Sequence, residues 1–377
     1  MTAKQIIIFL LILLILPGCI AKFIPAVNEN KEVLVVQGLI TDQPETDTIK
    51  LSKSIPFGRL SEASPVTGSI VTISDDQGNR YSLLETKTGI YITDASSFRG
   101  VPGRFYTLHV STRGDINLNY ESSPVEMMAV PAIDSLYYDK VVVEQPFESF
   151  KGIDACQIYL DTHDPSNNCK YYRWDFSETW EFRLLFEVPN QTCWISDNSH
   201  SINTKSTAAF DEARIIRLPI NYITNVTDRL RTKYSILVNQ YSINEDEYNY
   251  WEKIQNVSVQ VGGLYDVIPA SIPSNIQCIE NPEEKVLGYF SVSAKSSKRI
   301  FIQDNFEGII DNYKNCVTDT ILTDKPAGLN QTVWILMYNL CAFPCNPTFE
   351  ITTHKECTDC TLRGTTFKPL FWSDDKK

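Results

Sequence analysis

The sequence predicts a mainly β protein, with an N-terminal immunoglobulin-like antiparallel β-sandwich followed by a larger β-rich domain that has one or a few short helices. Three observations support this fold class. Runs rich in β-branched residues alternate with turn clusters through residues 33–130, alternation of apolar and polar residues continues for about fifteen residues from Tyr172, and only one segment has helical spacing. At 377 residues, 43% of them hydrophobic, the chain is long enough to form two packed cores.

The chain begins with the features of an export signal. Lys4 precedes an apolar run of 11 residues, Ile6 to Leu16, which is shorter than the roughly 20 residues that span a bilayer. The run ends in Leu16-Pro17-Gly18-Cys19, the pattern of a bacterial lipoprotein signal in which the cysteine thiol is acylated and becomes the first residue. We therefore predict a signal peptide over 1–18 and a lipidated tether over 19–32. The alternative is a plain signal peptide with an incidental cysteine.

Residues 33–130 are predicted to form the sandwich. Residues 68–73 are a β-branched run, and residues 75–79 are a turn cluster of Asp, Gln, Gly and Asn. Between 105 and 110 the side chains alternate, which places Tyr106, Leu108 and Val110 on one face of a strand and Phe105, Thr107 and His109 on the other. Strands of this kind without a helical pattern are typical of a small antiparallel sandwich.

The second domain is predicted over 131–377, and its most informative segment is a long alternating one, which predicts either one long strand or a hairpin whose register keeps phase. The even positions from 172 to 186 are aromatic or apolar except for Glu178. A carboxylate on an aromatic face must be paired, hydrogen-bonded or directed into a cavity. The candidate ligand-binding or structural cluster is therefore Tyr172, Trp174, Glu178 and Trp180. We expect an arginine partner for Glu178, with an acid or base role in an open cleft as the alternative.

The one helical segment follows this strand region. Ser242 and Glu245 have the spacing of a capping box, and apolar side chains follow at helical spacing at Tyr250, Trp251 and Ile254. The sequence therefore predicts a helix that begins after Ser242.

The cysteines predict disulfides near the C-terminus. Ten cysteines are present, and all except Cys19 lie at or after position 156. In an exported chain such residues are first interpreted as disulfide partners, so we expect Cys341, Cys345, Cys357 and Cys360 to be oxidised, with the pairing left open. The alternative is a four-thiolate zinc site, which the two closely spaced pairs also resemble.

Composition and motifs exclude several functions. The formal net charge of −12 is unsuited to nucleic acid, which requires basic surfaces, and to polybasic attachment to lipid. The four histidines are scattered, and the sequence has no HExxH, no P-loop, no GxGxxG and no nucleophile elbow. We therefore predict no catalytic residue, no metal and no cofactor.

Several blocks of sequence resemble one known family. The chain is similar to the Bacteroidetes outer-membrane lipoproteins grouped as domain of unknown function 4249. The resemblance is carried, beyond the segment ending in Cys19, by residues 34–42, 172–174, 178–181, 234–241, 262–267, 286–290, 359–364 and 368–372. It implies an outer-membrane location and a TonB-dependent outer-membrane transporter as partner, and it implies no substrate.

Together these observations predict a non-enzymatic accessory protein, attached to outer-membrane lipid through Cys19, that captures ligand for the transporter or supports its barrel. Attachment to the periplasmic face of the membrane and attachment to its cell-surface face are both consistent with the sequence. The alternatives are a secreted envelope hydrolase that acts on glycans and a purely structural envelope lipoprotein.

Overall fold

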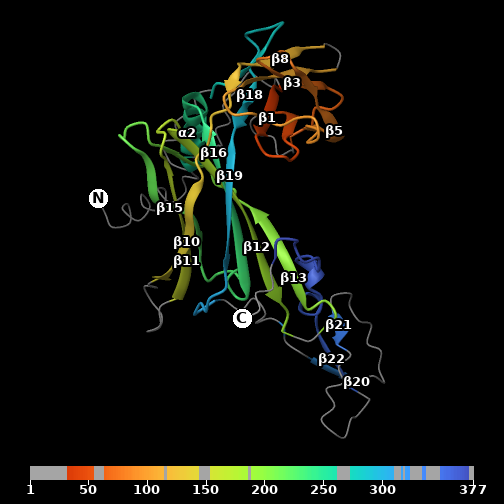
Figure 1. The fold of residues 1–377 in the computed structure, drawn as a ribbon. Coiled ribbons are helices and arrows are strands. Elements are labelled where there is room, and N and C mark those ends of the chain that lie inside the picture. Colours follow the sequence, from red (N-terminus) through yellow and green to blue (C-terminus); the bar gives the residue numbers. More distant parts are fainter. Residues whose placement is uncertain are drawn as a thin grey trace, which may run out of the picture.

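The computed structural model describes residues 32–54, 63–113, 117–143, 153–185, 188–260, 272–309, 316, 319–322, 333–336 and 349–372. Nearly all of the regular structure in these segments is β, arranged in five sheets with one α-helix, which confirms the predicted fold class (Figure 1). The predicted signal peptide and tether, including Cys19, lie outside the described residues.

The first two sheets pack face to face as a sandwich. One sheet has the order β18 (Leu287–Ser293), β1 (Leu34–Thr41), β2 (Thr48–Lys53), β6 (Ile90–Ile92) and β5 (Leu84–Lys87). The other has the order β17 (Ile276–Cys278), β8 (Asn119–Ser122), β7 (Phe105–Ser111), β3 (Ile70–Asp75) and β4 (Arg80–Ser82), and β9 (Val125–Glu126) also pairs with β7. Their inward side chains form one core, to which β7 contributes Tyr106, Leu108 and Val110 as the alternation predicted.

Two strands of this sandwich come from far along the chain. The predicted range of 33–130 contains most of it, but β17 and β18, between residues 276 and 293, complete its two sheets. The pairing of β18 with β1 is parallel, whereas the other ladders of these sheets are antiparallel. Gly288 permits this pairing, because its φ is 90° and a Cβ there would lie 1.9 Å from the Val36 carbonyl oxygen.

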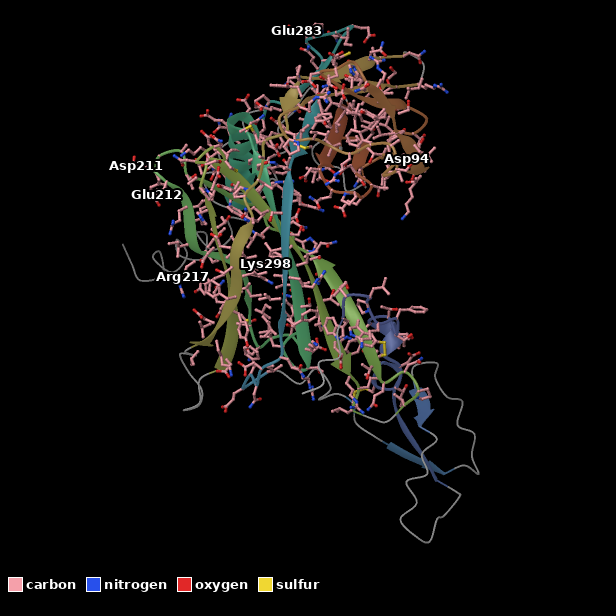
Figure 2. All side chains as sticks on the ribbon, viewed as in Figure 1. Asp94, Asp211, Glu212, Arg217, Glu283 and Lys298 are labelled. Carbon is pink, nitrogen blue, oxygen red and sulfur yellow. A yellow bond between two sulfur atoms is a disulfide. The ribbon has the colours of Figure 1, made fainter. Side chains whose placement is uncertain are left out.

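The second pair of sheets forms a separate core. One sheet has the order β10 (Ile133–Val143), β11 (Ile153–Asp164) and β15 (Ala213–Ile223). The other has the order β13 (Thr192–Asn198), β12 (Tyr171–Arg183), β16 (Lys233–Ile243) and β19 (Lys295–Ile302), with β14 (Asn203–Ser206) also paired to β12. The predicted alternating segment is thus one strand of 13 residues. Charged residues beside and within β15, among them Glu212 and Arg217, project outward at the edge of this unit (Figure 2).

The two sandwiches are joined by an almost continuous strand. β18 belongs to the first, β19 belongs to the second, and only Ala294 lies between them, so that they run end to end in Figure 1. Beside this junction, the Lys295 backbone N–H donates to Asp42 Oδ1 at 2.9 Å, and Gln43 Nε2 donates to the Lys295 carbonyl at 2.9 Å. A loop of the first sandwich therefore contacts the first residue of β19 directly.

The C-terminal part packs on β13. A small sheet of β20 (Asp319–Leu322), β22 (Phe349–His354) and β21 (Val333–Leu336) is followed by the short 3-10 helices η1 (Lys355–Cys357) and η2 (Cys360–Leu362). Trp194 and Thr365 exchange two backbone hydrogen bonds of 2.9 and 3.0 Å. Arg363 forms an ion pair of 2.9 Å with the buried Asp228. This segment is therefore held against the edge of the sheet.

Two disulfides connect the C-terminal part to the rest of the chain. Cys193 of β13 pairs with Cys360, and Cys316 pairs with Cys357. Because Cys357 and Cys360 belong to different disulfides, they do not form the thiolate pair that the zinc alternative requires. Cys341 and Cys345 lie outside the described residues.

Reduction should therefore destabilise the protein. Each disulfide closes a long loop, and the loss of such a cross-link typically lowers the free energy of unfolding by about 2–4 kcal/mol. We expect dithiothreitol to lower the melting temperature, Cys193→Ser to reproduce part of that loss, and EDTA to have no effect. A melting temperature that falls with EDTA and is unchanged by reductant would contradict the disulfide assignment.

Candidate functional site

The cluster singled out in the sequence lies in the core of the second sandwich. The exposed fractions of Tyr172, Trp174, Glu178 and Trp180 are 0%, 1%, 3% and 7%. The Tyr172 hydroxyl donates to the Cys169 carbonyl at 2.9 Å, and Trp174 Nε1 donates to Gln240 Oε1 at 2.9 Å. These side chains are packed together rather than arranged around a cleft, which is the arrangement expected of a scaffold.

Glu178 has the arginine partner that its position predicts. Arg229 Nη2 lies 3.2 Å from Glu178 Oε1, and the Tyr234 hydroxyl donates to Glu178 Oε2 at 2.6 Å. Asn221 Nδ2 donates to the same oxygen at 3.3 Å. Burial, reinforced by the neighbouring Glu178 carboxylate, raises the pKa of Tyr234 well above its usual value. Tyr234 therefore remains a neutral donor, and Glu178 is fully engaged inside the protein.

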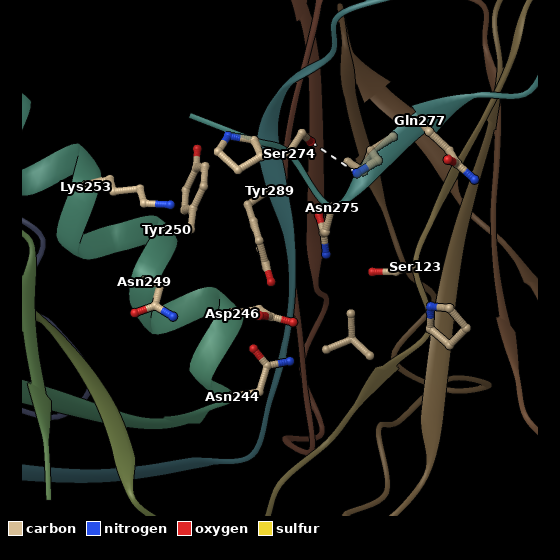
Figure 3. Close-up of a pocket in the computed structure, with 14 residues that line it drawn as sticks. Ser123, Asn244, Asp246, Asn249, Tyr250, Lys253, Ser274, Asn275, Gln277 and Tyr289 are labelled. Atoms are coloured by element: carbon tan, nitrogen blue, oxygen red, sulfur yellow. Dashed lines mark hydrogen bonds between the residues drawn. The ribbon is translucent and has the colours of Figure 1, made fainter. Parts of the chain in front are cut away.

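A cavity of about 500 Å³ lies where the helix meets the first sandwich (Figure 3). This is within the size range of small-molecule sites. One wall is α2 (Glu245–Gln260) and the other consists of the β8–β9 turn, β17 and β18. The lining residues are Ser123, Pro124, Val125, Asn244, Asp246, Asn249, Tyr250, Lys253, Pro273, Ser274, Asn275, Ile276, Gln277 and Tyr289.

The helix α2, which forms one wall of the cavity, begins directly after Asn244. The Glu247 backbone N–H donates to Asn244 Oδ1 at 2.8 Å, so Asn244 is the N-cap. The predicted capping box at Ser242 is wrong, because Ser242 is a buried residue of β16 whose hydroxyl donates to the Met128 carbonyl. The strand pairing of β16 continues to Ile243, which moves the start of the helix two residues along the chain.

The buried face of α2 is anchored by Glu247, which is 0% exposed. The Ser291 hydroxyl of β18 donates to Glu247 Oε1 at 2.6 Å, and Trp251 Nε1 donates to the same oxygen at 3.0 Å. Burial raises the pKa of Glu247, while the positive charge of Arg173 acts in the opposite direction. Arg173 itself lies over the rings of Tyr241 and Trp251 at 4.8 and 5.0 Å. The helix is thus attached to strands of both sandwiches.

The opposite face of α2 presents polar groups to the cavity. Asp246, Asn249 and Lys253 lie on this wall and Gln277 on the facing one, and no side-chain hydrogen bond joins any of them to another described residue. Tyr250 and Tyr289 are in contact, with their ring centroids 4.8 Å apart. The cavity thus combines an aromatic surface with uncommitted donors and acceptors, a combination that alternation and helical spacing alone did not reveal.

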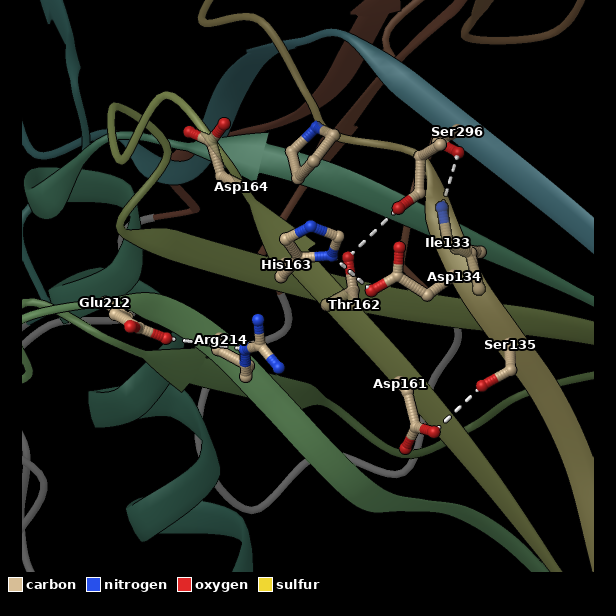
Figure 4. A network of polar contacts seen from close by, with 12 residues as sticks. Ile133, Asp134, Ser135, Asp161, Thr162, His163, Asp164, Glu212, Arg214 and Ser296 are labelled. Carbon is tan, nitrogen blue, oxygen red and sulfur yellow. Dashed lines mark hydrogen bonds and ion pairs between the residues drawn. The ribbon is translucent and has the colours of Figure 1, made fainter.

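A second hollow of about 380 Å³ lies at the end of β11. His163 Nδ1 is 2.6 Å from Asp134 Oδ2, and Arg214 of the neighbouring strand forms an ion pair of 3.5 Å with Glu212 (Figure 4). The nearby Ser135 hydroxyl donates to Asp161 instead. Within the described segments, no hydroxyl is hydrogen-bonded to His163.

One serine–histidine–carboxylate series occurs on the outer face of the first sandwich. Ser74 Oγ lies 2.7 Å from His109 Nε2, and His109 Nδ1 lies 3.3 Å from Glu121 Oε2. The three residues are neighbours on β3, β7 and β8, so cross-strand pairing alone can bring them together. None of them lines the cavities described above.

The described part of the chain contains no group of three or more His, Cys, Asp or Glu side chains placed to hold a metal ion. Its helix is not long and apolar enough to cross a bilayer.

Glu178→Gln should weaken the fold. The amide keeps the shape but loses the charge that Arg229 faces, and hydrogen bonds to charged groups contribute about 1.5–3 kcal/mol. Because the Arg229 side chain is 27% exposed, the loss should be smaller than for a fully buried pair. We expect chemical denaturation to show this decrease, with Glu212→Gln, at 78% exposure, as the unaffected control. A Glu178→Gln protein that unfolds like the wild type would contradict the structural role.

Comparison with known proteins agrees with the resemblance. No curated protein matches the chain. The family described as a domain of unknown function, DUF4249, matches residues 20–299, which contain the first sandwich, α2 and most of the second sandwich. Because this match covers well over half of the 377 residues, the chain belongs to the DUF4249 family.

Proposed function

We propose that this protein is a lipid-anchored accessory of the outer membrane that captures a small ligand for a TonB-dependent transporter. Acylation of Cys19 provides the attachment, and the two sandwiches form the part of the protein that extends from the membrane. Support comes from the signal-like N-terminus, from the resemblance of the chain to outer-membrane lipoproteins, and from two disulfides, which are typical of exported proteins.

The cavity beside α2 is the observation that favours capture of a ligand over passive support of the barrel. Its walls come from elements that are packed into both sandwiches, and its polar side chains are uncommitted. A hollow of about 500 Å³ with polar and aromatic lining has the size and make-up of a small-molecule site. The absence of Glu178 from the cavity is consistent with binding rather than with glycan hydrolysis at that residue.

Affinity purification from detergent-solubilised outer membranes tests this function. The wild-type protein should co-purify with a TonB-dependent transporter, identified by mass spectrometry. Cys19→Ala should leave the protein unprocessed or released from the membrane, because each buried acyl methylene contributes about 0.8 kcal/mol and more than one chain makes attachment stable.

Two outcomes would contradict the proposal. One is the absence of any TonB-dependent transporter from the wild-type eluate. The other is a Cys19→Ala protein that stays in the outer-membrane pellet after a high-salt wash. Glu178→Gln serves as a control in the same experiment, because it alters the core without changing the anchor.

A hydrolase is the second candidate, favoured by the series Ser74, His109 and Glu121. In this reading, His109 accepts the Ser74 proton as the hydroxyl attacks an ester carbonyl, and Glu121 orients the imidazole. A fluorophosphonate probe should then label Ser74 in the wild type and fail to label His109→Ala. Equal, negligible labelling of both proteins would leave these residues as a cross-strand hydrogen-bonding group.

A further inference from the structure

The cavity wall formed by α2 carries opposite charges at its two ends. Asp246, Asn249 and Lys253 are spaced i, i+3 and i+7, which places them in one row on the helix surface. Seven residues of α-helix rise about 10 Å, so the carboxylate and the ammonium are two turns apart. The amide of Asn249 lies between them (Figure 3).

The facing wall adds groups suited to a peptide backbone. Gln277 contributes an amide that can both donate and accept, and Ser123 contributes a hydroxyl. Asn275 is already committed, because its side chain donates to the carbonyl of Phe290 and accepts from its N–H. Amide and hydroxyl groups on both sides of a hollow can pair with the N–H and C=O groups of an extended ligand.

Tyr289 adds a further hydroxyl to the polar lining. The residue is only 7% exposed, yet no hydrogen bond joins its hydroxyl to any other described residue. Figure 3 shows this hydroxyl directed into the space between α2 and the first sandwich. A hydroxyl in this position can donate to or accept from a ligand in the cavity.

We infer that this cavity binds a short peptide with free termini, its ammonium at Asp246 and its carboxylate at Lys253. This inference rests on the proposed role in ligand capture and assigns the class of ligand. Three extended residues span about 10 Å, which matches the separation of the two charges. Side chains of the peptide would pack on Tyr250 and Tyr289. A neutral sugar of the same size would leave both charges unused.

Calorimetric titration of the full mature chain carrying Cys19→Ala, which keeps the protein in solution, tests the inference with trialanine as the probe. We expect trialanine to bind, and Asp246→Asn and Lys253→Gln each to weaken binding at least tenfold. Glu252→Gln removes a charge from the same helix outside the cavity and should bind trialanine like the parent. Circular dichroism checks that every variant retains its fold.

Blocked peptides make the test specific for the two contacts. N-acetyl-trialanine should bind weakly to the parent and no more weakly to Asp246→Asn, because the acetyl group and the substitution remove the same interaction. Trialanine amide should behave in the same way toward Lys253→Gln.

Three results would overturn the inference: no binding of trialanine, equal affinity for the blocked peptides, or binding of maltotriose in their place. Each would leave the proposed accessory function intact if the transporter still co-purifies. Conversely, trialanine binding without a co-purifying transporter would retain the peptide site and reject the partner.

Discussion

The structure depends on one constraint, the continuous passage of the chain from β18 into β19. These strands complete sheets in two different sandwiches, and Ala294 is the only residue between them. The parallel pairing of β18 with β1 requires Gly288, since any side chain there would collide with the Val36 backbone. Once this ladder forms, the first residue of β19 lies beside Asp42 and Gln43, and the two sandwiches are positioned relative to each other.

The cavity is a consequence of this junction. α2 follows β16 of the second sandwich, yet its buried Glu247 accepts a hydrogen bond from Ser291 of β18. Movement of the helix away from the first sandwich would break this hydrogen bond to the carboxylate, and hydrogen bonds to charged groups are among the stronger ones. The opposite face of α2 lies across the cavity from β17 and the β8–β9 turn. Contacts within the protein hold these walls in place, so a ligand does not have to order them when it binds.

The sequence predicted those features that depend on local pattern. The strand from Tyr171 to Arg183 and the faces of β7 follow from alternation with a period of two, and the partner of Glu178 follows from the cost of burying a charge. The helix was predicted with the wrong cap, because Ser242 and Asn244 are both good caps and only the extent of strand pairing in β16 distinguishes them.

Features that depend on distant residues could not be predicted in this way. Nothing local indicates that β18 pairs with β1, about 250 positions away, or that Cys360 pairs with Cys193, 167 positions away. The cavity also depends on residues that are far apart in the sequence. Its row of Asp246, Asn249 and Lys253 looks like an ordinary solvent-facing helix surface, and it becomes a candidate site only because two strands from elsewhere place Gln277 and Tyr289 opposite it.

The two buried glutamates show how similar residues serve different purposes in this protein. Glu178 is neutralised by Arg229 within one core, and its hydrogen bonds close a local network with Tyr234 and Asn221. Glu247 receives its hydrogen bonds from α2 and β18, with Arg173 of β12 as the nearby cation, so its interactions cross from one sandwich to the other. Loss of the Glu178 carboxylate should weaken the second sandwich, whereas loss of the Glu247 carboxylate should loosen the contact between the two sandwiches. Because the cavity lies at that contact, its shape depends more on Glu247 than on the carboxylate that the sequence made conspicuous.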